Sequence, residues 1–171
     1  MLERRKLMIK LVRLDERMIH GQIAIKWSRV TGVDRIVVVN DEAAENSVIK
    51  KSLMMAAPQT VRVAIKGVRD SIALLNDPRM DTVNVLVIVA KLDDLLAVVE
   101  EVKNIPKINI GNYGRLAKPL GTDERKTFSH HLYADTYEIE LFKKLISYSI
   151  PTIYQVTPED ADVSLKDALG I

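Results

Sequence analysis

The 171-residue sequence contains no cysteine, which excludes disulfide scaffolds, cysteine-ligated zinc, iron–sulfur clusters and thiol nucleophiles. This absence fits a reducing compartment. The longest apolar stretch, residues 83–90, includes Asn84 and is far shorter than the ~20 residues that a membrane-spanning helix requires. Residues 1–10 are charged throughout, so the sequence predicts no signal peptide.

Several catalytic signatures are missing as well. The sequence has no glycine-rich nucleotide-binding loop after a strand, no G-x-S-x-G nucleophile motif and no H-E-x-x-H metal motif. Nucleotide binding by the usual loops, serine hydrolysis and zinc proteolysis are therefore disfavoured. Apolar residues make up 47% and charged residues 28%, a globular composition that rules out a disordered chain.

What the sequence does contain is an alternation of two hydrophobic periods. Short apolar runs predict strands at residues 9–14, 35–40, 61–65, 84–89 and 107–110. Amphipathic segments between them predict helices at residues 21–30, 43–55, 67–75 and 93–102. Because several strand runs are continuously apolar, we expect a parallel sheet that is covered on both faces by helices, which is an α/β fold.

The last third of the chain is less regular. Residues 111–127 are rich in glycine and predict a long loop that is either mobile or functional. A strand over 128–134 places His130 and His131 on opposite faces, one packed and one solvated. Asp135 and Glu138 form a predicted capping box at the start of a helix over 136–147. A strand over 150–156 and a helical turn within 159–168 complete the chain.

We interpret residues 8–171 as one domain that follows an N-terminal extension, residues 1–7. Met1 and Met8 are both candidate starts. Residues 1–20 carry a net charge of +3, whereas the whole chain carries +2. A solvated basic tail or an anionic ligand near this end would each explain the asymmetry.

The turn after the first predicted strand is the strongest candidate site. In open α/β sheets, ligands gather where the strands end, and loop 15–20 joins the first strand to the first helix. Arg13 and Arg17 supply planar forks for phosphate oxygens, and the helix start supplies unpaired N–H groups. The imidazole of His20 could accept a phosphoryl group near neutral pH or lie beside one. Gly21 lets a bulky group approach the backbone.

Asp15 has two candidate roles in this turn. It could orient Arg17, or it could accept a hydrogen bond from one imidazole nitrogen of His20 and so fix the tautomer. In the alternative interpretation, the arginines and Asp15 form surface ion pairs and His20 is a helix-cap residue.

Other candidate residues have one or two interpretations each. Asn40 and Asp41 follow the second strand, predicted to lie next to the first, and could serve the site or only a turn. Asp93 and Asp94 are predicted to cap a helix. Arg115 is either a solvated loop charge or a docking contact for a phosphorylated partner. Trp27 is predicted to lie in the core.

The stretch from Arg13 to Gln22, R-L-D-E-R-M-I-H-G-Q, resembles the R-x-D-x-R-x-I-H-G-Q signature of a known family. These are the mannose/fructose/sorbose-family IIB subunits of the bacterial sugar phosphotransferase system (PTS). V-V-V-N-D-E at 37–42, L-M-M-A-A-P at 53–58 and I-N-I-G at 108–111 are similar to other segments of that family, as are residues 142–145 and 154–156. Asn112 stands where the family has a second glycine, and residues 113–127 do not match its loop.

The resemblance implies a phosphotransferase in which His20 is transiently phosphorylated. His20 would receive the phosphoryl group from a IIA phosphohistidine and pass it to a hexose or amino sugar entering through the membrane subunits IIC and IID. It implies that Arg17 contacts the phosphoryl group and that Asp15 is the acidic position of the signature. Phosphoryl or substrate binding is assigned to the remaining candidates: Arg13, Gly21, Gln22, Asn40 and Asp41.

The resemblance also implies a three-layer α/β fold with a mostly parallel central sheet of about seven strands, one of them antiparallel. It implies no metal and no organic cofactor, no nucleic-acid partner, and a cytoplasmic location beside the membrane transporter. A homo-oligomer stays open. Two other functions remain as alternatives: a regulatory protein whose phosphorylation gates a partner, and a module that binds phosphate without covalent chemistry.

Overall fold

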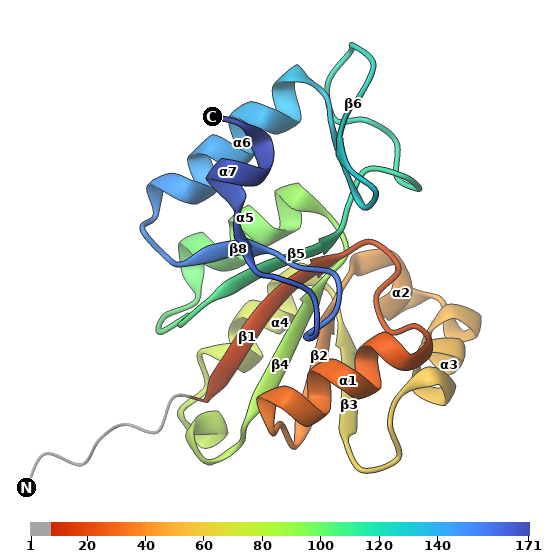
Figure 1. The fold of residues 1–171 in the computed structure, drawn as a ribbon. Coiled ribbons are helices and arrows are strands. Elements are labelled where there is room, and N and C mark those ends of the chain that lie inside the picture. Colours follow the sequence, from red (N-terminus) through yellow and green to blue (C-terminus); the bar gives the residue numbers. More distant parts are fainter. Residues whose placement is uncertain (1–7) are drawn as a thin grey trace, which may run out of the picture.

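The computed structural model describes residues 8–171, in which helices flank a central sheet (Figure 1). The prediction of an extension over residues 1–7 lies outside the described residues. The elements follow in the order β1 (Ile9–Asp15), α1 (Gly21–Thr31), β2 (Arg35–Val39), α2 (Asp41–Glu45), α3 (Ser47–Ala56), β3 (Arg62–Lys66), α4 (Val68–Leu75), the 3-10 helix η1 (Pro78–Thr82), β4 (Val85–Val89), α5 (Leu92–Glu101), β5 (Ile108–Asn112), β6 (Lys126–Ser129), β7 (Leu132–Ala134), α6 (Thr136–Ser147), β8 (Thr152–Tyr154), β9 (Val163–Ser164) and α7 (Leu165–Leu169).

Within residues 8–171, seven strands form one sheet in the order β3-β2-β4-β1-β5-β8-β9. Every neighbouring pair is parallel except β8 and β9, which are antiparallel. The predicted mostly parallel sheet with one antiparallel strand is confirmed. The two remaining strands, β6 and β7, pair with each other as a separate antiparallel hairpin.

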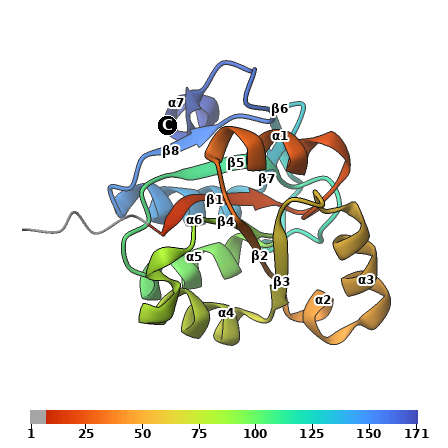
Figure 2. The ribbon, with the colours of Figure 1, turned by 90° about the horizontal axis from the view of Figure 1, so that it is seen from below.

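The two faces of the sheet carry separate hydrophobic cores. Along β2, Val37 and Val39 enter one core while Ile36 and Val38 enter the other, because successive side chains of a strand point to opposite faces. Helices α1 and α3 supply residues to the second core, and α5 and α6 supply residues to the first. Figure 2 shows α1 on one side of the sheet and α4 and α5 on the other. This double burial is why the strand runs are continuously apolar.

The strand order corrects one prediction. Strand β4 pairs with both β1 and β2 and therefore separates them. The expectation that Asn40 and Asp41 lie next to the first strand is wrong. The crossover from β1 through α1 skips one position, and apolar runs that are buried on both faces carry no information about which strand lies beside which.

The structure corrects three further predictions. The predicted helix 43–55 is two helices, because Asn46 has extended backbone and its side chain accepts hydrogen bonds from the first N–H groups of α3. His130 and His131 lie in the turn between β6 and β7 and not on one strand; His130 is exposed and His131 half-buried. Lys91, and not Asp93 or Asp94, occupies the cap position of α5.

The start of α6 agrees with the sequence prediction. Asp135 and Glu138 form the capping box, and the helix runs over the predicted residues. In the part of the chain that the structure describes, none of the helices combines the length and the apolar character needed to cross a bilayer.

Candidate phosphoryl-transfer site

A tight turn joins β1 to α1 at the carboxyl end of the sheet. The N–H of Met18 donates to the carbonyl of Asp15 at 2.9 Å, and Met18 has a φ of 59°, in the left-handed region. His20 is the N-cap residue of α1, with extended backbone and no capping hydrogen bond from its side chain. Gly21 begins the helix with a φ of 48°, a conformation that favours glycine. The imidazole is therefore presented at a helix start without serving as its cap.

Asp15 organises this turn and is fully buried. Its Oδ2 accepts hydrogen bonds from Nε2 of His20 at 3.0 Å and from Nη2 of Arg13 at 3.1 Å. Its Oδ1 accepts from the backbone N–H of Arg17 at 3.0 Å. Burial raises the pKa of Asp15, but the hydrogen bond from His20 and the charge of Arg13 outweigh it, so the pKa lies below its usual value. Asp15 is a buried carboxylate that holds the imidazole.

Arg13 supplies the charge that compensates Asp15. Its side chain is only 2% exposed, so it is not part of a surface ion pair. Burial lowers the pKa of Arg13, and Asp15 opposes that effect. Besides Asp15, the guanidinium donates to the Oδ1 of Asn109 and to the carbonyls of Gln155, at 3.2 Å, and Val156, at 3.0 Å.

Two other residues shape the space around this guanidinium. It lies 5.1 Å from the ring centre of Trp27, which is buried as predicted. Glycine is required at position 111 of the neighbouring strand β5, because a Cβ there would lie 2.1 Å from the guanidinium carbon of Arg13. The glycine of the I-N-I-G segment thus makes room for Arg13.

The remaining predicted site residues fall into two groups. Arg17 and Gln22 are exposed, and neither side chain forms a hydrogen bond or ion pair with residues 8–171. No described atom lies within 4 Å of the position of a Cβ at Gly21, so the space above it is open. By contrast, the Asn40 side chain caps α2, and Asp41 accepts a hydrogen bond from the N–H of Val68. These two contacts give both residues a structural role at the start of α2 and α4.

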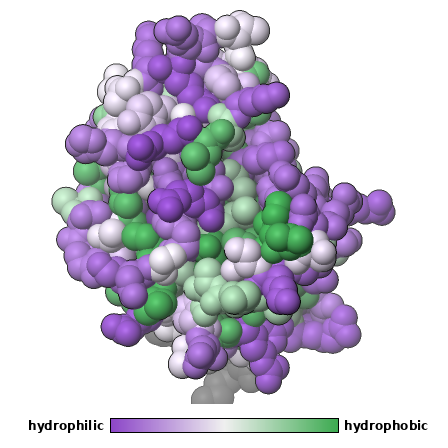
Figure 3. Space-filling model, turned by 90° about the vertical axis from the view of Figure 1, so that its right-hand side faces the viewer, coloured by the Kyte–Doolittle hydropathy of each residue, from purple (hydrophilic) through white to green (hydrophobic). Residues whose placement is uncertain are grey.

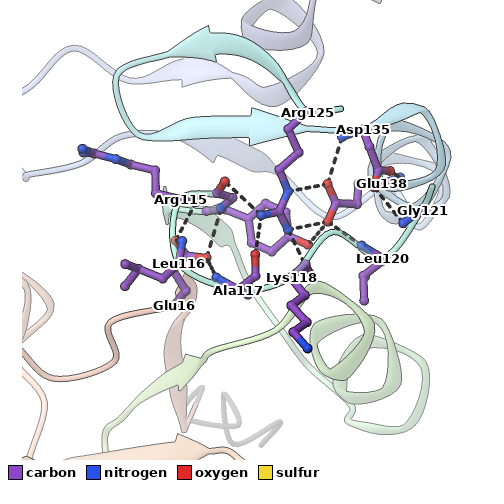
Figure 4. Close-up of polar contacts among 12 residues, drawn as sticks. Glu16, Arg115, Leu116, Ala117, Lys118, Leu120, Gly121, Arg125, Asp135 and Glu138 are labelled. Carbon is purple, nitrogen blue, oxygen red and sulfur yellow. Dashed lines mark hydrogen bonds and ion pairs between the residues drawn. The ribbon is translucent and has the colours of Figure 1, made fainter. Parts of the chain in front are cut away.

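The sequence did not predict that loop 113–125 folds against this turn. The Glu16 carboxylate accepts four backbone hydrogen bonds, at 2.8–3.3 Å, from the N–H groups of Gly114, Arg115, Leu116 and Ala117 (Figure 4). Successive N–H groups that converge in this way form an anion-binding concavity. A signal was present in the charge of Glu16 between Asp15 and Arg17, but its partners are about a hundred residues away along the chain.

A second carboxylate holds the other end of this loop. Glu138 is fully buried and accepts from Nε and Nη2 of Arg125, at 2.9 and 2.7 Å. It also accepts from the hydroxyl of Tyr113 at 2.9 Å and the N–H of Leu120 at 3.1 Å. Burial raises the pKa of Glu138, but the hydrogen bonds from Arg125 and the N–H donors lower it by more. The pKa therefore lies below its usual value and the group stays ionised. Figure 4 shows Arg125 and Glu138 at the centre of the loop.

Within residues 8–171, no cluster of three or more histidine, aspartate or glutamate side chains is placed to hold a metal ion. What the turn offers is an imidazole oriented by a buried carboxylate, a helix start and an exposed guanidinium. This arrangement defines a protein of the α/β class whose histidine turn lies at the carboxyl end of the parallel sheet, where open α/β sheets bind their ligands.

Comparison with known proteins gives the family. The family model for the PTS system sorbose subfamily IIB component matches residues 9–171, and the chain belongs to this family. IIB components of this kind are sugar phosphotransferases of the phosphotransferase system. The predicted family resemblance and enzyme class are confirmed.

The relatives support this membership over nearly the whole chain. A probable phosphotransferase enzyme IIB component of Streptococcus pyogenes serotype M6 is 35% identical, over 95% of this chain and 100% of that protein. The mannose-specific EIIAB component of Escherichia coli K12 is 30% identical, over 96% of this chain and 49% of its own length. The crystal structure of the IIB domain of the Klebsiella pneumoniae sorbose permease has a TM-score of 0.84, at 25% identity, and covers 95% of this chain and 96% of its own.

Proposed function

We propose that the chain is a phosphohistidine carrier in which Nδ1 of His20 is the phosphoryl acceptor. The observation that carries the proposal is the hydrogen bond between Nε2 of His20 and the ionised Asp15. A carboxylate only accepts, so Nε2 carries the proton and Nδ1 carries the lone pair. No hydrogen bond within the described part of the chain occupies Nδ1, and the His20 side chain is 19% exposed.

The transfer step balances without a cofactor. Nδ1 attacks phosphorus, the bond from phosphorus to the nitrogen of the donor imidazole breaks, and the donor leaves as a neutral ring. The phosphorylated ring of His20 keeps its Nε2 proton and gains positive charge, which the Asp15 carboxylate stabilises. Arg17 contacts the phosphoryl oxygens with its free guanidinium. In the onward step a sugar oxygen attacks phosphorus, the P–Nδ1 bond breaks and the hydroxyl proton leaves to solvent.

We infer that the donor is a PTS IIA component and that the sugar, a hexose or amino sugar, enters through IIC and IID. The E. coli relative supports the IIA partner, because its name places IIA and IIB in one chain. The turn lies on the right-hand side of Figure 1, and that side is hydrophilic toward its edges with apolar side chains across its middle (Figure 3). A face of mixed polarity suits a small contact that dissociates after every transfer. We place this exchange on the cytoplasmic side of the membrane transporter.

Labelling tests the proposal. Incubation with phosphorylated IIA should add one phosphoryl group that is stable to base and labile to acid, as a phosphoramidate is. His20→Ala should abolish the label, whereas His130→Ala, in the exposed hairpin turn, should retain it. A label that persists in His20→Ala refutes the assignment. Binding of phosphate without a covalent label would favour a phosphate-binding module, and a label that never reaches sugar in the presence of transporter membranes would favour a regulatory protein.

A further inference from the structure

The anion-binding concavity formed by residues 114–117 fixes a loop beside the histidine turn. Its occupant, Glu16, lies between Asp15, which holds His20, and Arg17. The N–H of Arg115 donates to Oε2 of Glu16 at 2.8 Å. Arg115 is therefore one hydrogen bond away from the residue that precedes Arg17. The four N–H groups also offset the negative charge of Glu16, which would otherwise repel a phosphoryl group nearby.

The side chain of Arg115 points away from the buried contacts of its own loop. Figure 4 shows it directed to the opposite side from Arg125 and Glu138. Arg115 is exposed, and its guanidinium forms no hydrogen bond or ion pair with residues 8–171. Its charge is available to a ligand.

The β6–β7 turn, which carries His131, also responds to the charge of Arg115. The N–H of Tyr113 donates to the carbonyl of His131 at 2.9 Å, which places that turn against the end of β5. Burial lowers the pKa of His131, and the charges of Arg115, His130 and Arg17 lower it further while Asp15 raises it. The charges of Arg115, Arg17 and Asp15 thus all act on this imidazole, and Asp15 also holds His20.

We propose that Arg115 is a second phosphoryl-binding residue, whose guanidinium contacts the oxygens of the phosphoryl group on His20 beside Arg17. Glu16 is the positioning residue that holds Arg115 there. The chemical reason is charge: a phosphoryl group carries close to two negative charges, and one exposed guanidinium compensates only part of them. This inference rests on the proposed function.

Single-turnover transfer from phosphorylated IIA tests the contact. At saturating donor, Arg115→Ala should slow labelling of His20 by about 10- to 100-fold, somewhat less than the loss expected for a fully buried donor. Arg115→Lys should restore part of the rate, because it keeps the charge but loses the fork. Lys118→Ala, an exposed cation of the same loop, is the matched control and should label at the wild-type rate.

A spectroscopic measurement distinguishes a contact between Arg115 and the phosphoryl group from a role of Arg115 in docking the IIA partner. A guanidinium that touches the phosphoryl oxygens favours their charged form, so Arg115→Ala should raise the phosphoryl pKa measured by ³¹P NMR on the phosphorylated protein. Glu16→Gln should show the same two effects more weakly, faster amide exchange at 114–117, and no additional loss when combined with Arg115→Ala. An increase in KM alone, with an unchanged saturated rate and an unchanged ³¹P titration, would overturn the proposal.

The two proposals fail in different ways. Wild-type protein that takes no label on His20 removes the proposed function and, with it, the role of Arg115. Normal labelling of His20 with an Arg115→Ala variant that matches Lys118→Ala in rate and ³¹P titration overturns the Arg115 role alone.

Discussion

Replacing Asp15 with asparagine should slow phosphoryl transfer and destabilise the fold, and both effects have the same cause. In the wild-type turn all three groups that face Asp15 are donors: Nη2 of Arg13, Nε2 of His20 and the N–H of Arg17. A carboxylate accepts from all three, but an amide has only one acceptor oxygen. Asp15→Asn must therefore turn its NH₂ either toward Arg17 or toward Arg13 and His20.

Each orientation has a definite cost. With NH₂ toward Arg17, two donors face each other and the carboxylate that stabilises the charged ring is gone. With NH₂ toward His20, the ring can accept through Nε2 only if Nδ1 takes the proton, and Nδ1 then has no lone pair for phosphorus. In both orientations the buried Arg13 loses its counter-charge, and breaking a buried pair in this way costs about 3–5 kcal/mol.

Two measurements check these consequences. For a chain of this size, about 2–4 °C of Tm per kcal/mol predicts a fall of roughly 6–20 °C in Asp15→Asn. Loss of the correctly protonated ring should slow single-turnover labelling of His20 by about 10²–10⁴-fold at a temperature where the variant is folded. Glu140→Gln, which removes the carboxylate of the exposed pair with Lys143, is the control and should leave both quantities unchanged. An Asp15→Asn variant that transfers within threefold of wild type would refute the tautomer argument.

Three further predictions concern charge. Arg17→Ala should slow transfer by about 10²–10³-fold and Arg17→Lys should recover only part of it, so a near-wild-type rate in Arg17→Ala would contradict its contact with the phosphoryl group. The second-order rate of transfer from IIA should fall as salt rises, because screening shortens electrostatic attraction, and a flat salt profile would show that steering is unimportant. Burial and then the neighbouring Asp93 raise the pKa of Asp94 to about 6 from 3.8, so ionisation of Asp94 lowers stability as pH rises through this range. Denaturant titrations should find Asp94→Asn more stable than wild type above pH 6, with the difference vanishing toward pH 3.8; equal stability at all pH values would contradict this origin of the shift.

Much of the fold could be predicted from the sequence because the signals are local. The continuous apolar runs predicted the central strands to within a residue or two, and the capping box predicted Asp135 as the N-cap of α6. The position of the histidine turn followed from the same pattern, since it is the segment between one apolar run and the next amphipathic helix. These features depend on residues that are close together in the chain.

The parts that could not be predicted depend on distant partners. From the sequence Arg13 is either a phosphate-binding fork or a member of a surface ion pair, because Asn109 and the carbonyls near residue 155 that bind it are distant in the chain. The loop that includes residues 113–125 is predicted to be mobile or functional because its glycines and charges give no local pattern, whereas in the structure Glu16 and Glu138 fix it. Apart from the charge of Glu16, its early indication was negative: the segment does not match the loop of the family that the rest of the chain resembles.

The partners of Arg13 also have a consequence for the order in which the protein is assembled during synthesis. Arg13 bonds to carbonyls 142 and 143 residues further along the chain, and Trp27 bonds to one 129 residues away. His20 is thus made well before the carbonyls that help to hold its supporting ion pair. Contacts of such long sequence separation form late because closing the intervening loop costs chain entropy. A nascent chain stopped before residue 155 would carry the acceptor histidine without a finished site.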